Sequence, residues 1–350
     1  MEQRQSIRMP TTVRIKPGVL DRLGLYLERA DRRRVAVLMS EGLPAHLPDR
    51  ARAGCKSAAV DVVATIEITD ASFENAARVL GELPAGCDAL VGLGGGKALD
   101  VAKYVAHLAG LPFFATPTSL ANDGFCSPQS SLTLAGHRRA LRASLPLAVI
   151  VDTEVCLQAP DPLWWSGVGD LVAKITAVAD WKLAFHARGT PVDDLAALLS
   201  DATVYQFQAL PERDDEGMRL LATALMLNGI AMALCRSSRP ASGSEHLISH
   251  ALERVSERPR LHGLQVGVAS HLVSRLQRQG SERIDRVLTA TGFWDGVARD
   301  PFARAEWLEA CRIAPTLKDD FHTVLHERDC GPEIERLLDE DPRLAACIRA

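Results

Sequence analysis

The first half of the chain alternates short runs of β-branched residues with segments that have apolar residues at helical spacing. This alternation is typical of βαβ units around a mostly parallel sheet. In the helix expected over Lys97–Leu108, the apolar positions form one face, which leaves Asp100 and Lys103 to face solvent. The predicted strands are Thr12–Ile15, Val35–Ser40, Ser57–Val63, Asp88–Gly92, Pro112–Thr116 and Ala148–Val151, and the other predicted helices include Gly18–Arg29 and Ala71–Leu83.

The pattern changes after Ala159-Pro160-Asp161-Pro162, where long Ala/Leu-rich amphipathic runs replace the alternation. We therefore predict an α/β nucleotide-binding domain over residues 1–157 and an all-helical domain over residues 158–350. The helices expected in the second domain are Gly169–His186, Val192–Gln208, Glu216–Arg236, Glu245–Glu257, Gly263–Gln279, Ile284–Thr291, Glu306–Arg312 and Pro332–Leu338.

Composition narrows the class of protein. Of the 350 residues, 47% are hydrophobic and 24% charged, which is typical of a soluble enzyme and not of a disordered chain. The net charge of -4 provides no overall basic surface for nucleic acid. No stretch reaches the ~20 uninterrupted apolar residues of a membrane span. Met1–Arg14 is polar and basic, without the apolar core of a signal peptide, so we expect a cytoplasmic protein.

The eight cysteines are widely scattered and include no CxxC pair. Such spacing favours neither a disulfide framework nor a zinc knuckle. We expect buried, reduced thiols that behave as small apolar side chains.

A glycine-rich segment, GLGGGKALD at residues 92–100, lies where a predicted buried strand gives way to a helix. Glycines let backbone N–H groups approach a phosphate, and the positive end of the helix favours its charge. The segment is not a Rossmann GxGxxG, because Lys97 takes the third glycine position, and Val91 and Ala98 rule out a P-loop. A plain turn would not require three successive glycines, so we predict a phosphate-binding turn.

A second segment, PTSLANDGFCSP at residues 117–128, concentrates hydroxyls, an amide and one carboxylate just after a predicted strand. Open α/β sheets bind ligands at that edge. Asn-Asp-Gly and Ser-Pro are also common turn formers, so composition leaves a ligand-binding loop and a plain turn both open.

The second half offers one carboxylate and three imidazoles as candidate metal ligands: Asp170, His246, His250 and His262. His246 and His250 are four residues apart, which places them on one face of a helix. An Asp with two His would leave one zinc position open for water or substrate. The spacing alone does not decide, because His322 and His326 have the same spacing.

Together these segments resemble the glycerol-1-phosphate dehydrogenase branch of a superfamily that also contains iron-containing alcohol dehydrogenases, glycerol dehydrogenase and dehydroquinate synthase. The similarity runs from about residue 88 to residue 275, through GLGGGKALDVAK, PTSLANDGFCSP, VIVDTEV, GVGDLVAKITAVADWKLA, SGSEHLISHAL and LHGLQVGV. It implies a dehydroquinate synthase-like architecture, and family analogy implies a homo-oligomer.

The resemblance implies a role for each motif residue. Asp170, His246 and His262 match the zinc ligands, and His250 matches a substrate-contacting histidine. Asp123 is expected to contact substrate beside the nicotinamide, whereas His322 and His326 are left with structural roles. The residues expected to contact NAD or NADP are Gly94, Gly95, Gly96, Lys97, Ala98, Thr118, Ser119, Leu120, Ala121 and Ser127.

The implied reaction is reversible hydride transfer between the cofactor and dihydroxyacetone phosphate or sn-glycerol 1-phosphate, or a related small polyol phosphate. One zinc, or another divalent metal, would polarise the carbonyl. Either His250 or Asp123 would relay the proton, and the sequence leaves that choice open. Two alternatives are a cyclase of the dehydroquinate synthase kind, which uses the cofactor transiently, and a catalytically silent paralogue.

The chain also departs from the family pattern. The branch commonly has Arg in place of Lys97, and His-Asp-Gly where this chain has Asn122-Asp123-Gly124. Glu41, after the second predicted strand, would bond a ribose hydroxyl and favour NAD, or would face solvent. The cations nearest to Asp170 along the chain are expected to be solvated rather than to bind phosphate; they are Lys174, Lys182, His186 and Arg188.

Overall fold

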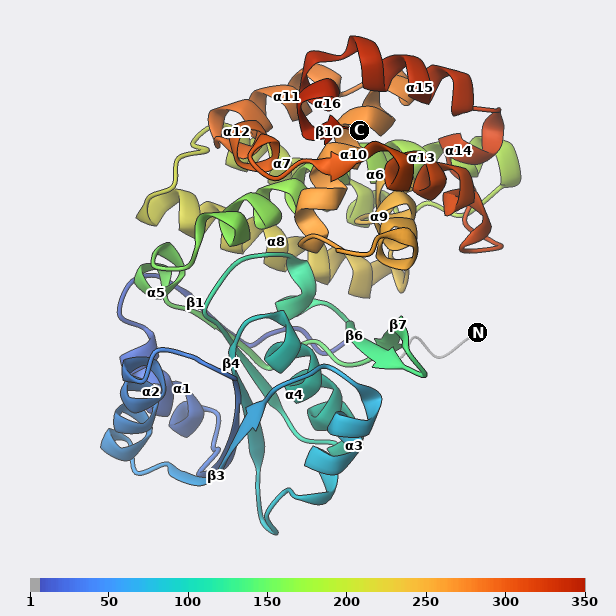
Figure 1. Cartoon of the computed structure of the whole chain (residues 1–350). Helices are drawn as coiled ribbons and strands as arrows, with labels where there is room; N and C mark the ends of the chain where they lie inside the picture. Colours follow the sequence, from blue (N-terminus) through green and yellow to red (C-terminus); the bar gives the residue numbers. More distant parts are fainter. Residues whose placement is uncertain (1–6, 350) are drawn as a thin grey trace. The chain divides into compact units, whose positions relative to one another are not determined.

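The computed structural model describes residues 7–349. Residues 1–6, part of the segment considered as a signal peptide, lie outside it. The chain divides into two compact units, with the division between Ala159 and Pro160, close to the predicted domain boundary. An α/β unit precedes the division and a largely helical unit follows it (Figure 1). The predicted fold class is confirmed.

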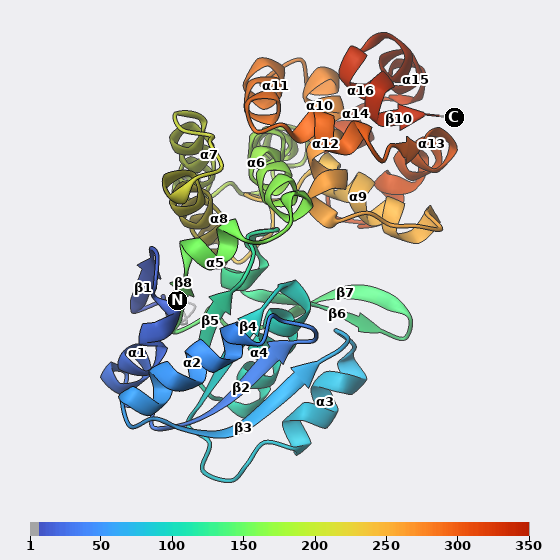
Figure 2. The same ribbon diagram turned by 60° about the vertical axis from the view of Figure 1, so that its left-hand side comes forward.

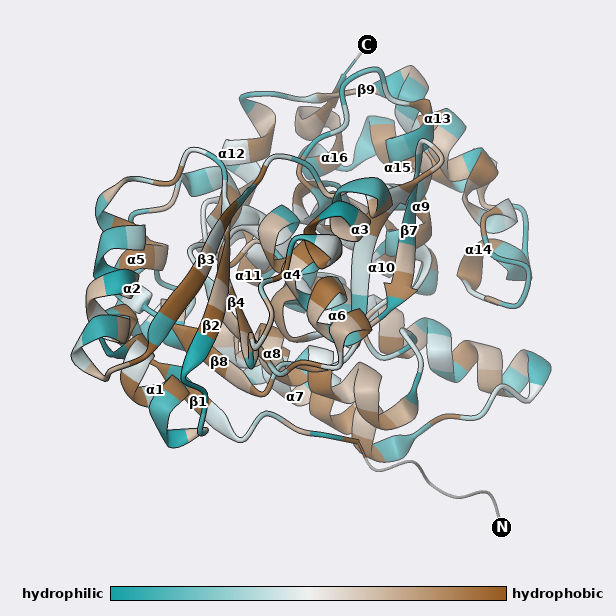
Figure 3. Ribbon diagram, turned by 90° about the horizontal axis from the view of Figure 1, so that it is seen from below, coloured by the Kyte–Doolittle hydropathy of each residue, from teal (hydrophilic) through white to brown (hydrophobic). Residues whose placement is uncertain are grey.

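The α/β unit is built on a six-stranded parallel sheet in the order β1-β8-β5-β4-β2-β3. Its central strands consist mostly of buried apolar residues, as strands covered on both faces require (Figure 3). The strands are β1 (Thr12–Ile15), β2 (Arg34–Ser40), β3 (Asp61–Ile68), β4 (Ala89–Gly94), β5 (Phe113–Pro117) and β8 (Ala148–Val151).

Helices cover both faces of this sheet (Figures 1 and 2). On one side, Leu27 and Leu47 belong to the same core cluster as Val37 and Val91 of the sheet. On the other side, the helix after the glycine turn lies so close to β4 that a side chain at Gly92 would come within 3.0 Å of Leu99. The helical elements of the unit are η1 (Leu20–Arg22), α1 (Leu23–Arg29), α2 (His46–Ser57), α3 (Phe73–Gly81), α4 (Gly96–Ala109), η2 (Asp123–Cys126) and α5 (Thr153–Leu157).

The prediction was wrong at Ser57, which ends helix α2 instead of beginning a strand. The strand begins only at Asp61, after Ala59 has turned the chain in a left-handed conformation with φ of 54°. Helix α2 was not predicted because polar residues dominate it and its buried side is limited to small or isolated groups such as Leu47 and Cys55.

An antiparallel hairpin of β6 (Gln129–Leu134) and β7 (His137–Arg142) was also missed (Figure 2). Strand β7 is almost entirely exposed and rich in arginine. It therefore lacks the alternation of apolar and polar residues by which half-buried strands are recognised.

The second unit is helical apart from one short parallel pair, β9 (Phe302–Ala303) with β10 (Ile348–Arg349). Each predicted helix is present, most with ends shifted by a few residues, but α6 begins at Asp161 and not at Gly169. Four short helical elements, α12, η3, α14 and α16, were missed. The helical elements are α6 (Asp161–Arg188), α7 (Asp194–Gln208), α8 (Asp215–Cys235), α9 (Ser244–Val255), α10 (His262–Gln277), α11 (Ser281–Ala290), α12 (Phe293–Ala298), α13 (Arg304–Ile313), η3 (Ala314–Thr316), α14 (Val324–Glu327), α15 (Gly331–Glu340) and α16 (Pro342–Cys347).

Helix α8 is, within the described residues, the one helix long and apolar enough to cross a membrane. Two-thirds of its most apolar window, 67%, is buried inside the protein. The helix packs against α7 and α6, so its apolar character is that of a core helix.

Candidate functional site

The glycine turn joins the end of β4 to the start of α4. Gly94 has φ of 144°, and a Cβ there would lie 2.2 Å from Ser40 Oγ, so this position requires glycine. The same hydroxyl accepts a hydrogen bond from Gly95 N at 3.0 Å. Gly96 opens the helix, and a Cβ there would meet no atom within 4 Å. The first N–H groups of α4 therefore border open space, as a phosphate-binding turn requires.

Parallel pairing places the second motif beside this turn. Gly94 is the register partner of Pro117, and Thr118 N donates to Gly94 O at 3.0 Å. Among the residues predicted to contact the cofactor, Lys97 is exposed and the small or hydroxyl residues Thr118, Ser119 and Ala121 are partly exposed, whereas the side chains of Ala98, Leu120 and Ser127 are buried. Hence the turn and the loop form one edge of the sheet.

The prediction for Lys103 was wrong. It was expected to face solvent together with Asp100, yet its side chain is fully buried and Asp100 is only 13% exposed. Lys103 Nζ donates to Gly124 O at 2.5 Å and to Ser127 Oγ at 3.2 Å, and it lies 3.5 Å from Asp100 Oδ1. Burial lowers the pKa of Lys103. The hydrophobic pattern was misleading because a partly buried carboxylate and a carbonyl together solvate the ammonium group.

These bonds fix the short turn that carries Asp123. The turn, η2, begins after Asn122, whose side-chain oxygen accepts from Gly124 N at 2.9 Å. Ser127 Oγ also donates to Gln129 O at 2.9 Å. The Ser127 hydroxyl is thus engaged by Lys103 and Gln129, and it positions the loop that bears Asp123.

The helical unit brings Asp170, His246 and His262 together. One potential ligand atom from each of the three lies within 4.8 Å of the others. His246 Nε2 is 3.5 Å from Asp170 Oδ1, and the rings of His246 and His262 are 5.1 Å apart between centroids. A carboxylate oxygen and two imidazole nitrogens are ligands suited to a divalent ion such as zinc. His250 lies at the edge of this cluster, with its ring stacked 6.1 Å from that of His262.

Three glycines let α6 and α10 approach closely enough to form the cluster. A Cβ on Gly169 would lie 2.0 Å from Gly263 O, and one on Gly263 would lie 1.8 Å from Ser166 O. A Cβ on Gly267 would lie 2.9 Å from the Cα of Gly169. Since Asp170 follows Gly169 and His262 precedes Gly263, this backbone contact sets the separation of the two ligands.

The ionisable groups around the cluster lie close enough to shift one another's pKa values. Burial alone would raise the pKa of Asp170, but the Lys174 ammonium and the hydrogen bond with His246 hold it well below its usual range. The prediction that Lys174 is solvated was also wrong. Its side chain is fully buried and donates to Asp170 Oδ1 at 3.3 Å and to Ala241 O at 3.4 Å. Lys182, His186 and Arg188 are exposed, as expected. Lys174 therefore balances the Asp170 charge.

The other histidine pair has structural partners. His322 Nε2 lies 2.6 Å from Glu327 Oε1, and His326 contacts Thr323 and Pro315 O. All eight cysteines are free, and six of them are buried.

Comparison with known proteins identifies the family. The model of the iron-containing alcohol dehydrogenase family matches residues 14–160. The glycerol-1-phosphate dehydrogenase of Aeropyrum pernix is 37% identical over 341 residues, which cover 95% of this chain and 96% of that protein. The chain belongs to the glycerol-1-phosphate dehydrogenase family. Another member, from Methanothermobacter thermautotrophicus, is 32% identical over 346 residues, which cover 95% of this chain and 97% of that protein.

Solved structures share the fold of this glycerol-1-phosphate dehydrogenase family member at lower identity. A probable glycerol dehydrogenase from Sinorhizobium meliloti has a TM-score of 0.74 at 20% identity and covers 96% of this chain and 99% of its own. The glycerol dehydrogenase of Schizosaccharomyces pombe has a TM-score of 0.75 at 15% identity, with coverage of 97% and 91%.

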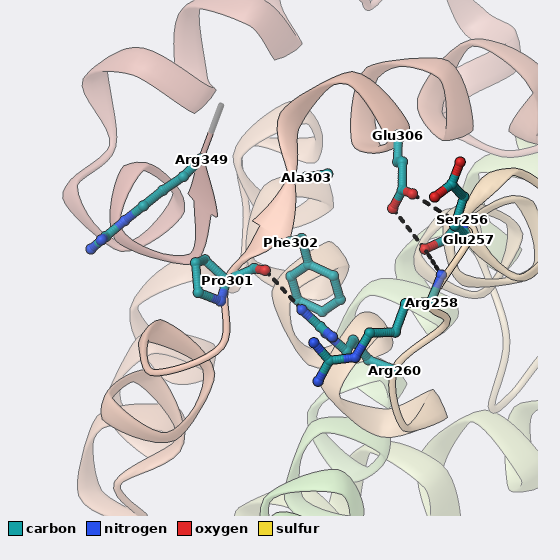
Figure 4. Close-up of a pocket in the computed structure, with 9 residues that line it drawn as sticks. All are labelled: Ser256, Glu257, Arg258, Arg260, Pro301, Phe302, Ala303, Glu306 and Arg349. Carbon is teal, nitrogen blue, oxygen red and sulfur yellow. Dashed lines mark hydrogen bonds between the residues drawn. The ribbon is translucent and has the colours of Figure 1, made fainter.

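A separate pocket of about 290 Å³ lies beneath the loop that leads to His262 (Figure 4). Its charged groups are only partly paired, and the buried Nε and Nη1 of Arg260 have no hydrogen-bond partner among the described residues. Arg258 and Arg260 pair with Asp300 at 2.9 and 2.8 Å, and Glu306 accepts from Ser256 Oγ at 2.6 Å. It contains none of the residues predicted for catalysis, so we do not assign it to the active site of this dehydrogenase family member.

Proposed function

We propose that this protein is a metal-dependent NAD(P) dehydrogenase that interconverts dihydroxyacetone phosphate and sn-glycerol 1-phosphate. The convergence of Asp170, His246 and His262 within 4.8 Å is the observation that carries the proposal. It is supported by the glycine turn and by relatives named glycerol-1-phosphate dehydrogenase (NAD(P)+) that match nearly the whole chain.

Each residue has a defined task in the proposed mechanism. When bound, a divalent metal supplies Lewis acidity and the dinucleotide supplies the hydride exchange. Asp170, His246 and His262 hold the metal, which we propose to be one zinc per chain. The N–H groups of Gly95, Gly96, Lys97 and Ala98, with the loop from Thr118 to Ala121, hold the pyrophosphate of NAD or NADP.

Proton transfer is assigned to one of two groups. His250 adjoins the metal ligands, and Asp123 is held on a turn fixed by Lys103. Imidazole is the side chain best suited to accept and donate protons near neutral pH, and a carboxylate oxygen can orient a substrate hydroxyl by accepting its hydrogen bond. We therefore propose His250 as the proton relay and Asp123 as a substrate-orienting residue.

Metal analysis coupled to a substrate panel tests the proposal. Purified protein is expected to carry about one zinc per chain and to oxidise NADH or NADPH when given dihydroxyacetone phosphate. His262→Ala is expected to lose both properties, whereas His322→Ala, from the other histidine pair, retains the metal. Turnover without net change in nicotinamide absorbance would indicate a cyclase, and no turnover with any small ketone or polyol would indicate a silent paralogue.

We also propose that the protein acts in the cytoplasm on a small phosphorylated molecule. The panel includes unphosphorylated dihydroxyacetone and glycerol, which are expected to react much more slowly. Equal rates with and without the phosphate group would overturn that part of the proposal.

A further inference from the structure

Glu245 adjoins the metal-ligand cluster without belonging to it. Its side chain is completely buried. Oε1 lies 2.9 Å from His246 Nδ1 and accepts from Gly243 N at 2.5 Å, while Oε2 accepts from Thr176 Oγ1 at 2.9 Å. Both oxygens are therefore held in place before any ligand binds.

This arrangement determines which nitrogen of His246 can bind metal. A carboxylate accepts hydrogen bonds and cannot donate them, so Nδ1 donates to Glu245 and the ring is held with Nε2 turned toward the cluster. Nε2 is the atom that lies 3.5 Å from Asp170 Oδ1. A charged partner behind the ring also makes the imidazole a stronger donor.

His262 is supported differently. Its Nδ1 lies 3.2 Å from the neutral hydroxyl of Ser249 and 4.0 Å from Glu253 Oε1. The His262 side chain is 26% exposed, whereas that of His246 is 10% exposed. The two histidines thus differ in the charge and the burial of their supports.

We propose that Glu245 is a positioning residue that fixes the orientation of the His246 ring and raises its affinity for a divalent cation. This inference rests on the proposed metal site. Loss of such a carboxylate partner typically weakens metal binding by about 10- to 100-fold.

The test is a zinc titration of metal-free protein against a chromophoric chelator. Glu245→Gln keeps the shape and removes the charge, and we expect its zinc Kd to rise about 10-fold or more. Glu253→Gln, near the other histidine, is the matched control and is expected to change the Kd by less than about threefold.

Failure of the two proposals can be told apart. Wild-type protein that binds no zinc would overturn the proposed metal function. Wild-type protein that binds zinc, with an unchanged Kd in folded Glu245→Gln, would overturn the role of Glu245 alone. Should Glu245→Gln fail to fold, Thr176→Val removes only the hydroxyl that holds Oε2. A weaker Kd in that variant supports the proposal and an unchanged one overturns it.

A second, independent observation concerns the outer face of α7. Its exposed residues include Leu195, Leu198 and Tyr205, at 62%, 67% and 57% exposure. With the exposed alanines Ala202 and Ala209 they recur at intervals of three and four residues, the spacing of a two-helix seam. Among the described residues, nine large apolar side chains are exposed. Three of them, Leu195, Leu198 and Tyr205, lie on α7, Leu210 follows it, and Phe185 lies near the end of α6.

The order of large and small side chains along this stripe favours packing against a second copy of α7. In an antiparallel pair centred on Ala202, Leu195 faces Ala209 of the partner subunit, and Leu198 faces the partner's Gln206. Small residues at the centre let the two backbones approach, and large residues meet small ones toward the ends. The five large side chains expose on the order of 500 Å², more than half of the ~800 Å² per partner in a standard stable interface.

We infer that two copies of the chain associate through their α7 helices about a two-fold axis. Sedimentation of the wild type is expected to give a mass of at least two chains, and Leu198→Glu is expected to halve it. Leu108→Glu, at a side chain 47% exposed on α4, is the matched control and leaves the mass unchanged. Ala202→Cys is expected to form an intermolecular disulfide under mild oxidation, because the axis brings the two positions together. A monomeric wild type, or a mass unaffected by Leu198→Glu, would overturn the inference.

Discussion

The two units of this protein build their candidate sites from different parts of the chain. In the α/β unit, the proposed cofactor-binding turn consists of backbone groups from one continuous segment, Gly94 to Ala98. In the helical unit, the metal ligands are side chains from the three helices α6, α9 and α10, and they are separated by up to 92 positions from Asp170 to His262. The first site depends on local geometry and the second depends on how helices pack.

The difference has physical consequences. The glycine turn borders open space and costs mainly backbone entropy. The metal cluster places Asp170, Lys174 and Glu245 in a buried environment, where each charge requires a partner. Substitutions at the cluster should therefore affect stability as well as binding, whereas a small side chain at Gly96 of the turn should affect binding alone.

The largest effect is expected from Gly263→Ala. The new Cβ would lie 1.8 Å from the backbone oxygen of Ser166, so α6 and α10 must separate. We expect a loss of about 3 kcal/mol or more in the free energy of unfolding, measured by urea denaturation, with loss of zinc binding. Gly81→Ala, where a Cβ meets nothing within 4 Å, is the control and should change stability by less than about 1 kcal/mol. Normal stability in Gly263→Ala would show that the helix contact does not set the ligand separation.

Lys103→Met should have the next largest effect. The variant fills the same space but leaves Gly124 O and Ser127 Oγ without their ammonium donor. We expect a loss of about 2 kcal/mol in unfolding free energy and a lower kcat with dihydroxyacetone phosphate, because the turn that bears Asp123 is no longer fixed. Lys56→Met, at an exposed position of α2, is the control. If kcat is retained despite lower stability, Lys103 does not position Asp123.

Asp180 should make the stability of the metal-free protein depend on pH. Burial, together with the nearby Glu245 charge, raises the pKa of Asp180 from 3.8 to about 6. The native state therefore holds a proton that the unfolded state has lost, so this stabilisation is present below pH 4 and disappears as the pH rises through 6. Between pH 5 and pH 7.5 the loss is about 1.4 kcal/mol.

Urea unfolding of the wild type and of Asp180→Asn at these two pH values measures the effect. The amide does not titrate, so this part of the pH dependence should vanish in the variant. Asp49→Asn, at a side chain 69% exposed, should retain the wild-type dependence. Parallel behaviour of wild type and Asp180→Asn would contradict the expected protonation.

The contrast between the two sites also explains how much the sequence could predict. The strands, the helix start at the glycine turn and the main helices follow from local hydrophobic periodicity, and their positions agree within a few residues except at the start of α6, which lies at Asp161 and not at Gly169. Helix α2 and strand β7 were missed because their apolar signal is weak. The residues of the metal cluster were selected by resemblance, since the spacing of His246 and His250 is shared by His322 and His326.

The sequence analysis failed mainly to predict which charged side chains are buried. Lys103 and Lys174 were assigned to solvated helix faces, and Glu245 was not considered at all. Their burial depends on partners distant in sequence, such as Gly124 for Lys103 and Thr176 for Glu245. The only signal in the sequence was indirect: each of these residues lies within four positions of a motif residue.

The smallest expected effect, at Gly96, is also the sharpest test of the comparison. A Cβ at this position meets no protein atom within 4 Å, so Gly96→Ala should fold with equal or slightly higher stability. The same Cβ would occupy the space where a pyrophosphate approaches the N-terminus of α4, and we expect the Kd for NADH or NADPH, measured by fluorescence, to rise about fivefold. Zinc affinity should not change, because the metal ligands lie in the other unit. Unchanged cofactor binding in this variant would contradict the proposal that the turn binds the pyrophosphate. A loss of stability would mean that Gly96, like the metal cluster, depends on tight packing.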